Sequence, residues 1–406
     1  MVPDAIVDRI LKLPGYGVCR SEFHEEHSEV TLWIEQTGRS PSYTCSGCGI
    51  ERDSIGTGRE RRVRDLPWGA WKVWLIVEIH RVSCRRCGVR AERLGFLEGK
   101  HPYTRRFADA VARDCDDAAV KRVASKWGLS PQTVRRIDKR TLVAWQASRK
   151  RRPLRYIGVD ELFWKKGKCL TIVSDLELGE PIWAGPDRKK ETLDRFFAEE
   201  LPPRRRRAVR AACVDMAGPF LASLREHLPH AAIVFDKFHV MMHVNKAVDE
   251  TRRQEFFRHK ERRAVLRGKR WLFLKRWDNL TTEHRSELKE ALKLNRRLFK
   301  AYYLKEQLDQ LWSYTYEGAA RRFFEAWLKS LRWQRLPAFQ TLAKTLTAHI
   351  DGILAYCHHK VPFGVVEAIN GNLRSIIRRG RGYTDHEYLI LKVRRSTARV
   401  RLEKAA

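Results

Sequence analysis

The alternation of apolar and polar residues predicts a β-sheet in the middle of the chain. Three short runs rich in strand-forming residues each end on an aspartate, namely Asp160, Asp215 and Asp236. A carboxylate at the end of a buried strand is costly unless another group pairs with it or coordinates it. Three strands that deliver aspartates to one edge of a sheet can therefore build a site for a hard cation.

The elements between these runs predict how the sheet is connected. Residues 169–175 follow the first run after a turn, so the two form a hairpin. Residues 179–184 contain a proline, which places them at a sheet edge. Helical stretches precede the other two aspartate-bearing strands. The order β-β-β-α-β-α-β predicts a mixed sheet with three antiparallel strands and two crossovers, consistent with the first part of a ribonuclease H-like core at residues 151–240.

Beyond residue 240 the alternation gives way to helical periodicity. Residues 241–360 are dense in Lys and Arg and carry aromatic residues at helical spacings, which indicates an α-helical insertion domain with an aromatic core. A base-stacking surface is the alternative role for one or two of these aromatics. They are Trp271, Phe273, Trp277, Trp312, Phe323, Phe324, Trp327 and Trp333.

A late helix offers a third carboxylate for the cation site. Residues 363–379 have one apolar face, and Glu367 lies on another face of the same predicted helix. With Asp160 and Asp215 it gives three oxygen ligands of the kind that suits Mg²⁺ or Mn²⁺. Two such ions, about 3.5–4 Å apart, can activate a water or a 3′-hydroxyl for phosphoryl transfer. The alternative for each aspartate is a helix cap or an ion pair with Arg.

Two further acids compete for a place in this site. Glu161 follows Asp160 directly, so strand alternation points it to the opposite face of the sheet. Asp175 stands at the end of a hairpin strand, where a role in the turn is expected.

Residues 101–150 predict a helix-turn-helix DNA-binding domain. Residues 118–127 form a first helix, a turn ends in the N-cap Ser130, and Pro131 opens a second helix. An ordinary helical hairpin is the alternative. The second helix would present four side chains to the DNA major groove. They are Gln132, Thr133, Arg135 and Arg136.

Two C-x2-C pairs lie within residues 1–100. Cys45 and Cys48 form the first pair, and Cys84 and Cys87 form the second. Such pairs predict a tetrahedral four-cysteine Zn²⁺ site, and four thiolates leave no open position, so the zinc is structural. Unrelated surface cysteines are the alternative. The cysteine count of nine is odd, which argues against a disulfide framework.

Composition narrows the partner to a polyanion. The chain has 406 residues, and its hydrophobic content of 43% indicates a globular protein. Its formal net charge of +32 favours nucleic acid as the binding partner. A membrane surface is the alternative. However, no apolar run reaches the length of about 18 residues needed to span a bilayer, and the N-terminus lacks a signal-peptide layout. We therefore expect a cytoplasmic protein that binds double-stranded DNA and no membrane.

The chain resembles transposases of the ISL3 insertion-sequence family, which have a DDE-type catalytic domain. The resemblance covers nearly the whole length, and begins with the paired cysteines before the helix-turn-helix. The other segments that carry it are residues 158–161, 214–216, 235–240, 245–249 and 366–370, and the basic tail at 378–383. The residue after the late glutamate is often Gly in this family, and here it is Ala368.

The resemblance implies roles for five residues of the catalytic core. Asp160, Asp215 and Glu367 would be the metal-binding triad, with the helical insertion between the second and third, and residues 361–406 forming the last part of the core. Asp236 and His239 would form the D-x2-H element beside the site, where His239 contacts the scissile phosphate or positions the last helix. A structural histidine bonded to Asp236 is the alternative.

The resemblance also implies a function. The protein would bind the terminal inverted repeats of its insertion sequence, cleave DNA with metal-activated water and join the 3′-hydroxyl to target DNA. We expect a homodimer or larger homo-oligomer on DNA, associated with the bacterial nucleoid. The alternatives are a catalytically inactive regulator derived from a transposase and a metal-dependent nuclease without strand transfer. Basic side chains near the site would hold phosphates, namely Arg374, Arg378, Arg379 and Arg381.

Overall fold

The computed structural model describes residues 4–37, 42–53, 58–150, 152–165, 167–216, 218–258, 267–361, 363–380 and 383–405. Within it the chain divides into two compact units, Met1–Arg149 and Lys150–Ala406. Both predicted N-terminal domains therefore belong to one unit, and the predicted catalytic and helical domains to the other. No helix among the described residues is long and apolar enough to cross a membrane.

The first unit opens with a helix and a four-stranded sheet of order β1-β2-β6-β5. β2 runs parallel to β6, and the other pairs are antiparallel. Val73, Leu75 and Val77 of β6 alternate with exposed or half-buried neighbours and are buried on the inner face. Two small hairpins accompany the sheet: β3-β4 lies between β2 and β5 in the chain, and β7-β8 follows β6. The elements are α1 (Asp4–Leu11), β1 (Tyr16–His24), η1 (Glu25–His27), β2 (Glu29–Gln36), β3 (Tyr43–Thr44), β4 (Glu51–Arg52), β5 (Arg59–Trp68), β6 (Trp71–Ile79), β7 (Arg81–Cys84) and β8 (Gly88–Ala91).

Three helices complete the first unit: α2 (Arg105–Asp117), α3 (Val120–Trp127) and α4 (Pro131–Ser148). The predicted turn between the last two is confirmed. Gly128 closes α3 with a φ of 57°, a conformation that glycine adopts without steric cost. Ser130 then caps α4 by accepting a hydrogen bond from the backbone N–H of Thr133.

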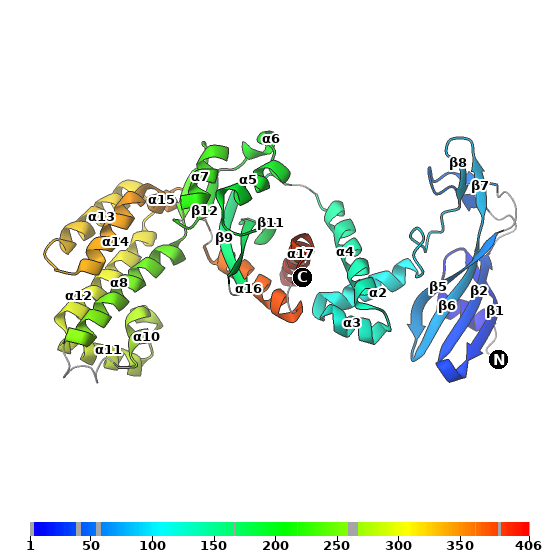
Figure 1. Ribbon diagram of the computed structural model, residues 1–406, viewed down its shortest axis with the longest axis horizontal. Coiled ribbons are helices and arrows are strands. Elements are labelled where there is room, and N and C mark those ends of the chain that lie inside the picture. The colour runs from blue at the N-terminus through cyan, green and yellow to red at the C-terminus, as the bar shows by residue number, and fades with distance from the viewer. Residues whose placement is uncertain are drawn as a thin grey trace. The chain divides into compact units, whose positions relative to one another are not determined.

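The second unit is built on a five-stranded sheet of order β11-β10-β9-β12-β13. β9, β10 and β11 are antiparallel neighbours, whereas β12 runs parallel to both β9 and β13. The predicted mixed sheet is confirmed, and the predicted β-β-β-α-β-α-β order holds with one addition, the short helix α6 before β12. Figure 1 labels β9, β11 and β12 of this sheet, with α5, α6 and α7 beside them. The elements are β9 (Tyr156–Lys165), β10 (Lys168–Asp175), β11 (Glu180–Pro186), α5 (Lys190–Glu199), α6 (Pro203–Arg206), β12 (Ala211–Val214), α7 (Gly218–His227) and β13 (Ala232–Phe235).

Helices cover both faces of this sheet. On one face Ile157 and Val159 of β9 pack with Phe196 of α5 and Leu224 of α7. On the other face the strands pack against two late helices, α16 (Phe363–Gly380) and α17 (His386–Ala405). Burial on both faces explains why the Asp-terminated runs are almost continuously apolar.

The region between β13 and α16 is helical, as predicted, and its first helix begins at Lys237 rather than after residue 240. Its aromatic core is confirmed for four residues and not for two. The buried side chains are Phe273, Trp312, Phe324 and Trp327, whereas Trp271 and Trp333 are exposed. The elements are α8 (Lys237–Arg258), α10 (Arg270–Leu274), η3 (Trp277–Asn279), α11 (Thr282–Leu294), α12 (Arg296–Asp309), η4 (Gln310–Ser313), α13 (Glu317–Leu331), α14 (Pro337–Ala348), α15 (Ile350–Leu354) and η5 (Ala355–Cys357).

Candidate zinc, DNA-binding and catalytic sites

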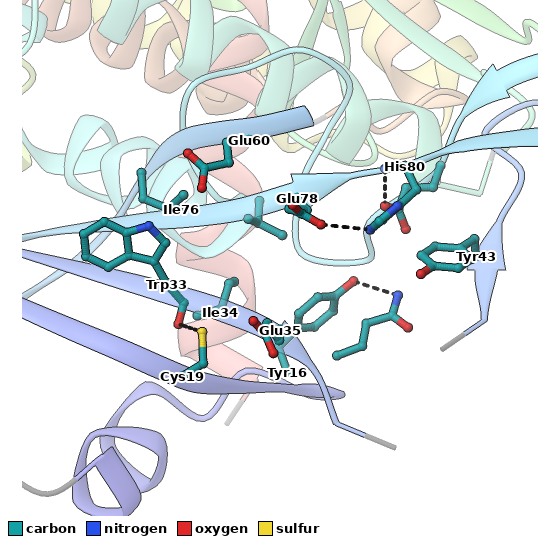
Figure 2. A pocket seen from close by; sticks show the side chains of 13 residues that line it. Tyr16, Cys19, Trp33, Ile34, Glu35, Tyr43, Glu60, Ile76, Glu78 and His80 are labelled. Atoms are coloured by element: carbon teal, nitrogen blue, oxygen red, sulfur yellow. Dashed lines mark hydrogen bonds and ion pairs between the residues drawn. The ribbon is translucent and has the colours of Figure 1, made fainter. Parts of the chain in front are cut away.

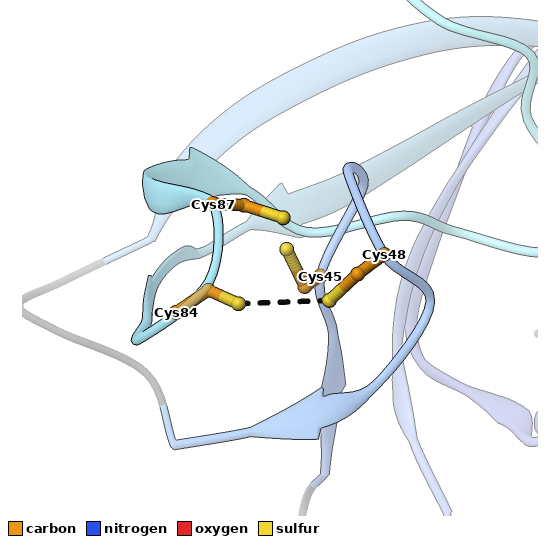
Figure 3. A group of neighbouring side chains, drawn as sticks. All are labelled: Cys45, Cys48, Cys84 and Cys87. Atoms are coloured by element: carbon orange, nitrogen blue, oxygen red, sulfur yellow. Dashed lines mark hydrogen bonds between the residues drawn. The ribbon is translucent and has the colours of Figure 1, made fainter.

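The four predicted cysteines come together in the first unit (Figure 3). Cys45 and Cys48 lie in the turn after β3, and Cys84 and Cys87 lie in the turn between β7 and β8. Their Sγ atoms all lie within 4.8 Å of one another. A side chain on Gly47 would place its Cβ 2.9 Å from the Cys87 sulfur, so this position requires glycine. The geometry brings together the sulfur donors that tetrahedral Zn²⁺ uses.

Backbone groups prepare this cluster to hold a cation. The backbone N–H of Arg86 is the largest cause that lowers the pKa of Cys84, to about 6, against the opposing effect of burial. Backbone hydrogen bonds also lower the pKa of Cys45. Burial and the neighbouring thiols raise the pKa of Cys87 to about 12. The cluster therefore carries a thiolate at neutral pH, and a bound cation would draw off the remaining thiol protons.

The second helix of the helix-turn-helix presents polar residues at its N-terminus. Gln132 and Arg136 are exposed, while Val134 and Ile137 on the opposite face are buried. Thr133 is half-buried; its hydroxyl lies 2.9 Å from that of Ser130 and accepts a hydrogen bond from Arg136. The predicted DNA-facing residues thus begin α4, where a recognition helix contacts base edges.

An ion pair with a buried carboxylate ties this helical domain to the N-terminal sheet. Asp65 of β5 is buried and accepts hydrogen bonds from the Thr104 hydroxyl at 2.6 Å and from Arg106 Nε at 2.8 Å. Thr104 is also the N-cap of α2. Because α2 begins on this pair, the sheet and the helix-turn-helix are held as one body.

A cavity of about 330 Å³ in the first unit is lined by several carboxylates (Figure 2). His80 Nε2 lies 3.5 Å from the Glu78 carboxylate, and Glu92 accepts a 2.6 Å hydrogen bond from the His80 backbone N–H. Burial raises the pKa of Glu92. Glu35 and Glu60 also line the cavity. Carboxylates repel phosphates, so this cavity is not suited to contact DNA.

In the second unit, the sheet register brings Asp160 and Asp215 side by side. Val159 pairs with Val214 on parallel strands, so the residues that follow them lie side by side. Asp215 directly follows the end of β12, as predicted, but β9 continues from Asp160 to Lys165, so the prediction that the first strand ends at Asp160 is wrong. The hairpin with β10 extends the strand beyond the aspartate. His239 of α8 lies between the two carboxylates. Its Nε2 is 3.6 Å from Asp160 Oδ1 and its Nδ1 is 3.6 Å from Asp215 Oδ2.

The contacts of His239 bear on the alternative that it is a structural histidine bonded to Asp236. Asp236 is buried and accepts a hydrogen bond of 2.8 Å from the backbone N–H of Phe238, so it caps α8. Its burial raises its pKa. The ion-pair contacts of His239 are with Asp160 and Asp215, not with Asp236.

The two aspartates change the charge of this histidine. Burial lowers the pKa of His239, but its close contact with the Asp160 carboxylate and the negative charges of Asp215, Asp160 and Asp236 outweigh burial and raise the pKa to about 9. At neutral pH His239 is therefore an imidazolium that neutralises the carboxylates beside it.

α16 reaches this site through Asn370, a residue for which the sequence predicted no role. Asn370 is 4% exposed, and its Nδ2 donates a hydrogen bond to Asp160 Oδ2. The helix can approach because position 158 is glycine. A Cβ there would lie 3.0 Å from Val366 Cγ2 and 2.7 Å from Leu176 Cδ2. This role is visible only from the packing of α16 against β9. The sequence identifies Asn370 only as the last residue of the segment 366–370.

Glu367 lies on the same helix, three residues before Asn370, and is exposed. That spacing places both residues on neighbouring positions of one helix face. Among the described residues, only the four cysteines form a group whose ligand atoms all lie within 4.8 Å. The three predicted carboxylates are thus less closely gathered than the cysteines.

The structure gives each of the rival acids a partner of its own. Asp175 accepts hydrogen bonds from the backbone N–H groups of Glu177 at 2.9 Å and Leu178 at 3.1 Å, so it holds a turn, as expected. Glu161 lies 3.5 Å from Arg188, and burial raises its pKa.

The oxygen donors of this site fit a hard divalent cation. Two carboxylates face one point, and Asn370 Oδ1 beside them is a buried acceptor without a hydrogen-bond partner among the described residues. Carboxylate and amide oxygens are ligands that Mg²⁺ and Mn²⁺ accept.

A basic stripe extends along α16 beyond the site. Arg374, Arg378 and Arg379 are exposed, and the first two share the helix face of Glu367 by their spacing. Arg381 lies outside the described residues.

Comparisons with known proteins match all parts of this architecture. Residues 157–393 match a family model described as transposase. Residues 41–87 match the zinc finger of transposases IS204, IS1001, IS1096 and IS1165, and residues 92–142 match the helix-turn-helix domain of transposase family ISL3.

Two curated relatives are similar over most of their length. The chain is 32% identical over 387 residues to the transposase for insertion sequence element IS1001 of Bordetella parapertussis, which covers 94% of this chain and 95% of the relative. It is 27% identical over 376 residues to the transposase for element IS1557 of Mycobacterium tuberculosis, covering 85% and 84%. The zinc finger, the helix-turn-helix and the transposase domain follow one another as in one protein family, and the chain belongs to the ISL3 family of transposases.

Proposed function

We propose that this transposase acts by DDE-type chemistry, with Asp160, Asp215 and Glu367 as its metal-binding acids. The observation that carries the proposal is the convergence of Asp160 and Asp215 on His239, with α16 joined to Asp160 through Asn370. Asp160 lies within β9, Asp215 directly follows the adjacent parallel strand β12, and Glu367 lies one helical turn before Asn370. When bound, Mg²⁺ or Mn²⁺ ions would activate a water or a 3′-hydroxyl of DNA for attack and stabilise the leaving oxygen.

The strand order supports a ribonuclease H-like core for this chemistry. Three antiparallel strands followed by two parallel ones place the first strand in the centre, where Asp160 is reached from both sides. In the proposal, residues 151–240 and 361–406 form the two parts of the core, and the helices of 241–360 are an insertion between the second and third acids.

The residues around the acids have separate tasks in the proposal. The imidazolium of His239 balances their charge before the cation and the phosphate arrive, and Asp236 fixes the first turn of α8 that carries it. Asn370 holds Asp160 in a fixed rotamer. The exposed arginines Arg374, Arg378 and Arg379, together with Arg381, neutralise DNA phosphates near the site.

The first unit selects the DNA in this proposal. The structural Zn²⁺ of Cys45, Cys48, Cys84 and Cys87 holds the two turns together. The start of α4 reads the terminal inverted repeats through Gln132, Thr133, Arg135 and Arg136. Because an element has two ends, we propose that the protein works as a homodimer or larger assembly, cleaving each end and joining it to target DNA.

The test is cleavage and joining of a labelled duplex that carries the terminal repeat of the element. We expect cutting at the repeat end and joining to target DNA with Mg²⁺, no reaction with EDTA, and no cutting of a scrambled repeat. Tight repeat binding without cutting in Mg²⁺ or Mn²⁺ would refute the enzyme and indicate a DNA-binding regulator. Cutting without joining would indicate a nuclease.

A further inference from the structure

The helical region contains a wide apolar cavity of about 740 Å³. Its walls come from η3 and from the neighbouring helices α11 and α12, far along the chain from the aspartates. Five of its lining residues are aromatic or aliphatic, three are cationic and one is acidic. They are Trp277, Leu292, Phe299, Tyr302 and Tyr303; Lys289, Lys293 and Arg296; and Glu306.

Two aromatic rings of this cavity remain largely open to solvent. Phe299 is 50% exposed and Tyr303 is 53% exposed. They stand one turn apart on α12, with ring planes inclined by only 11° and centroids 6.3 Å apart. By contrast, Tyr302 is buried, and its hydroxyl donates to the Lys275 carbonyl. Tyr302 thus belongs to the core, whereas Phe299 and Tyr303 each leave about half of the side chain exposed to solvent at the cavity.

The charges at the cavity favour an anionic occupant. Lys289 Nζ lies 5.5 Å from the centre of the Trp277 ring. Among the described residues, neither Lys293 nor Arg296 forms an ion pair with an acid. The acid of the cavity, Glu306, is already occupied, since its carboxylate lies 2.9 Å from Lys305 Nζ and accepts from the Trp277 backbone N–H. A ligand here meets flat apolar rings and unneutralised cations together.

We propose that this cavity binds an unpaired base of a DNA strand, stacked on Phe299 and Tyr303, with the flanking phosphates held by Lys293 and Arg296. The proposal rests on the proposed function, because it assumes that DNA strands reach the helical region. A nucleotide combines an aromatic face with an anionic phosphate. The faces of a paired base are covered by its neighbours, so only an unpaired base can use these rings. An apolar protein helix would use the rings and leave the cations without a partner.

The test compares two duplexes of equal length that share one strand with a single 2-aminopurine, which pairs with thymine in the first and faces an abasic site in the second. We expect the full-length protein to bind the second at least about fivefold more tightly and to quench its fluorescence by stacking, since stacking on an aromatic side chain strengthens binding by about 5- to 150-fold per base. Phe299→Ala with Tyr303→Ala should abolish both effects while changing the affinity for the paired duplex less than about twofold. These exposed side chains can be removed with little effect on folding.

The matched control is Trp333→Ala, which removes an aromatic that is 78% exposed in the same helical region but does not line the cavity. It should keep both the preference and the quenching. Lys293→Gln with Arg296→Gln should weaken binding of the unpaired strand and lower its salt dependence, with a slope change of about 0.7 for each lost phosphate contact.

The inference is overturned if the wild-type protein shows no preference for the unpaired base, or if the double aromatic variant keeps it. Dissociation of a wild-type oligomer by Phe299→Ala and Tyr303→Ala, without a change in quenching, would overturn it in favour of a protein interface. Its failure is separable from that of the proposed function, because cutting at the repeat end is measured on the paired duplex. A protein that cuts normally but does not stack the base refutes only this inference.

Discussion

Removal of the Asn370 side chain should slow DNA cleavage without weakening DNA binding. Asn370→Ala deletes a donor that is almost fully buried and hydrogen-bonded to the Asp160 carboxylate. A hydrogen bond to a charged group contributes about 1.5–3 kcal/mol. If the positioning of Asp160 is fully expressed in the transition state, the single-turnover cleavage rate falls about 10- to 150-fold. The recognition helix lies in the other compact unit, so the affinity for the repeat stays within about twofold.

The matched control for this prediction lies on the same helix. Asn372→Ala removes an exposed asparagine two residues further along α16 and should cut at the wild-type rate. Both rates are measured at saturating protein with a labelled repeat duplex, and binding is measured in parallel by anisotropy. Equal rates for Asn370→Ala and the wild type would refute the reasoning that Asn370 positions Asp160. So would an equal loss in both variants, which would indicate a general effect on the helix.

Three further predictions concern the zinc cluster and two carboxylates that hold elements of the fold together. Cys84→Ser should lower bound zinc to well below one equivalent per chain and weaken repeat binding, whereas Cys19→Ser, an exposed cysteine outside the cluster, should keep both; full zinc in Cys84→Ser would contradict the four-cysteine site. Asp65→Ala removes the carboxylate partner of Arg106, whose side chain is 32% exposed, and the acceptor of the buried Thr104 hydroxyl. It should destabilise the first unit by about 1.5–3 kcal/mol in urea unfolding; a loss below about 0.5 kcal/mol would show that the pair is not needed. Burial alone would raise the pKa of Asp194, but its hydrogen bonds outweigh burial and lower the pKa in the folded state. The charge of Asp194 therefore stabilises the folded protein at pH values above the ordinary Asp pKa of about 3.9. This stabilisation is lost as the pH falls through the lowered pKa of the folded state. Asp194→Asn should therefore be less stable than the wild type at pH 7, with a difference that shrinks below about pH 4; a constant difference across this range would contradict the charge effect.

The sheet and the zinc cluster were predictable because local patterns specify them. Apolar runs that end on Asp160, Asp215 and Asp236 carry strand propensity and a polar terminus in the same few residues, and each became a strand of one sheet. The paired cysteines carry their own spacing, and each turn has a glycine within it or directly after it, namely Gly47 in the first and Gly88 after the second. In both cases a few consecutive residues carry the residue types and the spacing on which the prediction depends.

The contacts around the aspartates were not predictable because they join elements far apart in the sequence. Asn370 reaches Asp160 across 210 positions, and this depends on the close approach that Gly158 allows. Likewise, His239 was predicted near the site, but only the packing of α8 shows that it lies between Asp160 and Asp215.

The cavity aromatics illustrate the opposite difficulty. Phe299 and Tyr303 stand at helical spacing, and so do Phe324 and Trp327, yet the first pair is half exposed and the second is buried. Helical periodicity shows which residues share a face, but not whether another helix covers that face. The sequence therefore raised base stacking as an alternative without identifying the residues that offer it.

The most direct test of the central claim is the metal-dependent cleavage rate of three conservative variants, Asp160→Asn, Asp215→Asn and Glu367→Gln, on the repeat duplex. Each keeps the shape of the side chain and removes its charge. Asp351→Asn, at a carboxylate that is 88% exposed, is the control. We predict that all three lose cleavage in Mg²⁺ by about a hundred- to a thousandfold or more, as expected when a group that stabilises the transition state through the catalytic ions is lost, while binding of the repeat and the control rate are unchanged. Cleavage by Glu367→Gln at the wild-type rate would contradict the assignment of the third acid, and cleavage by Asp160→Asn or Asp215→Asn would contradict the site itself.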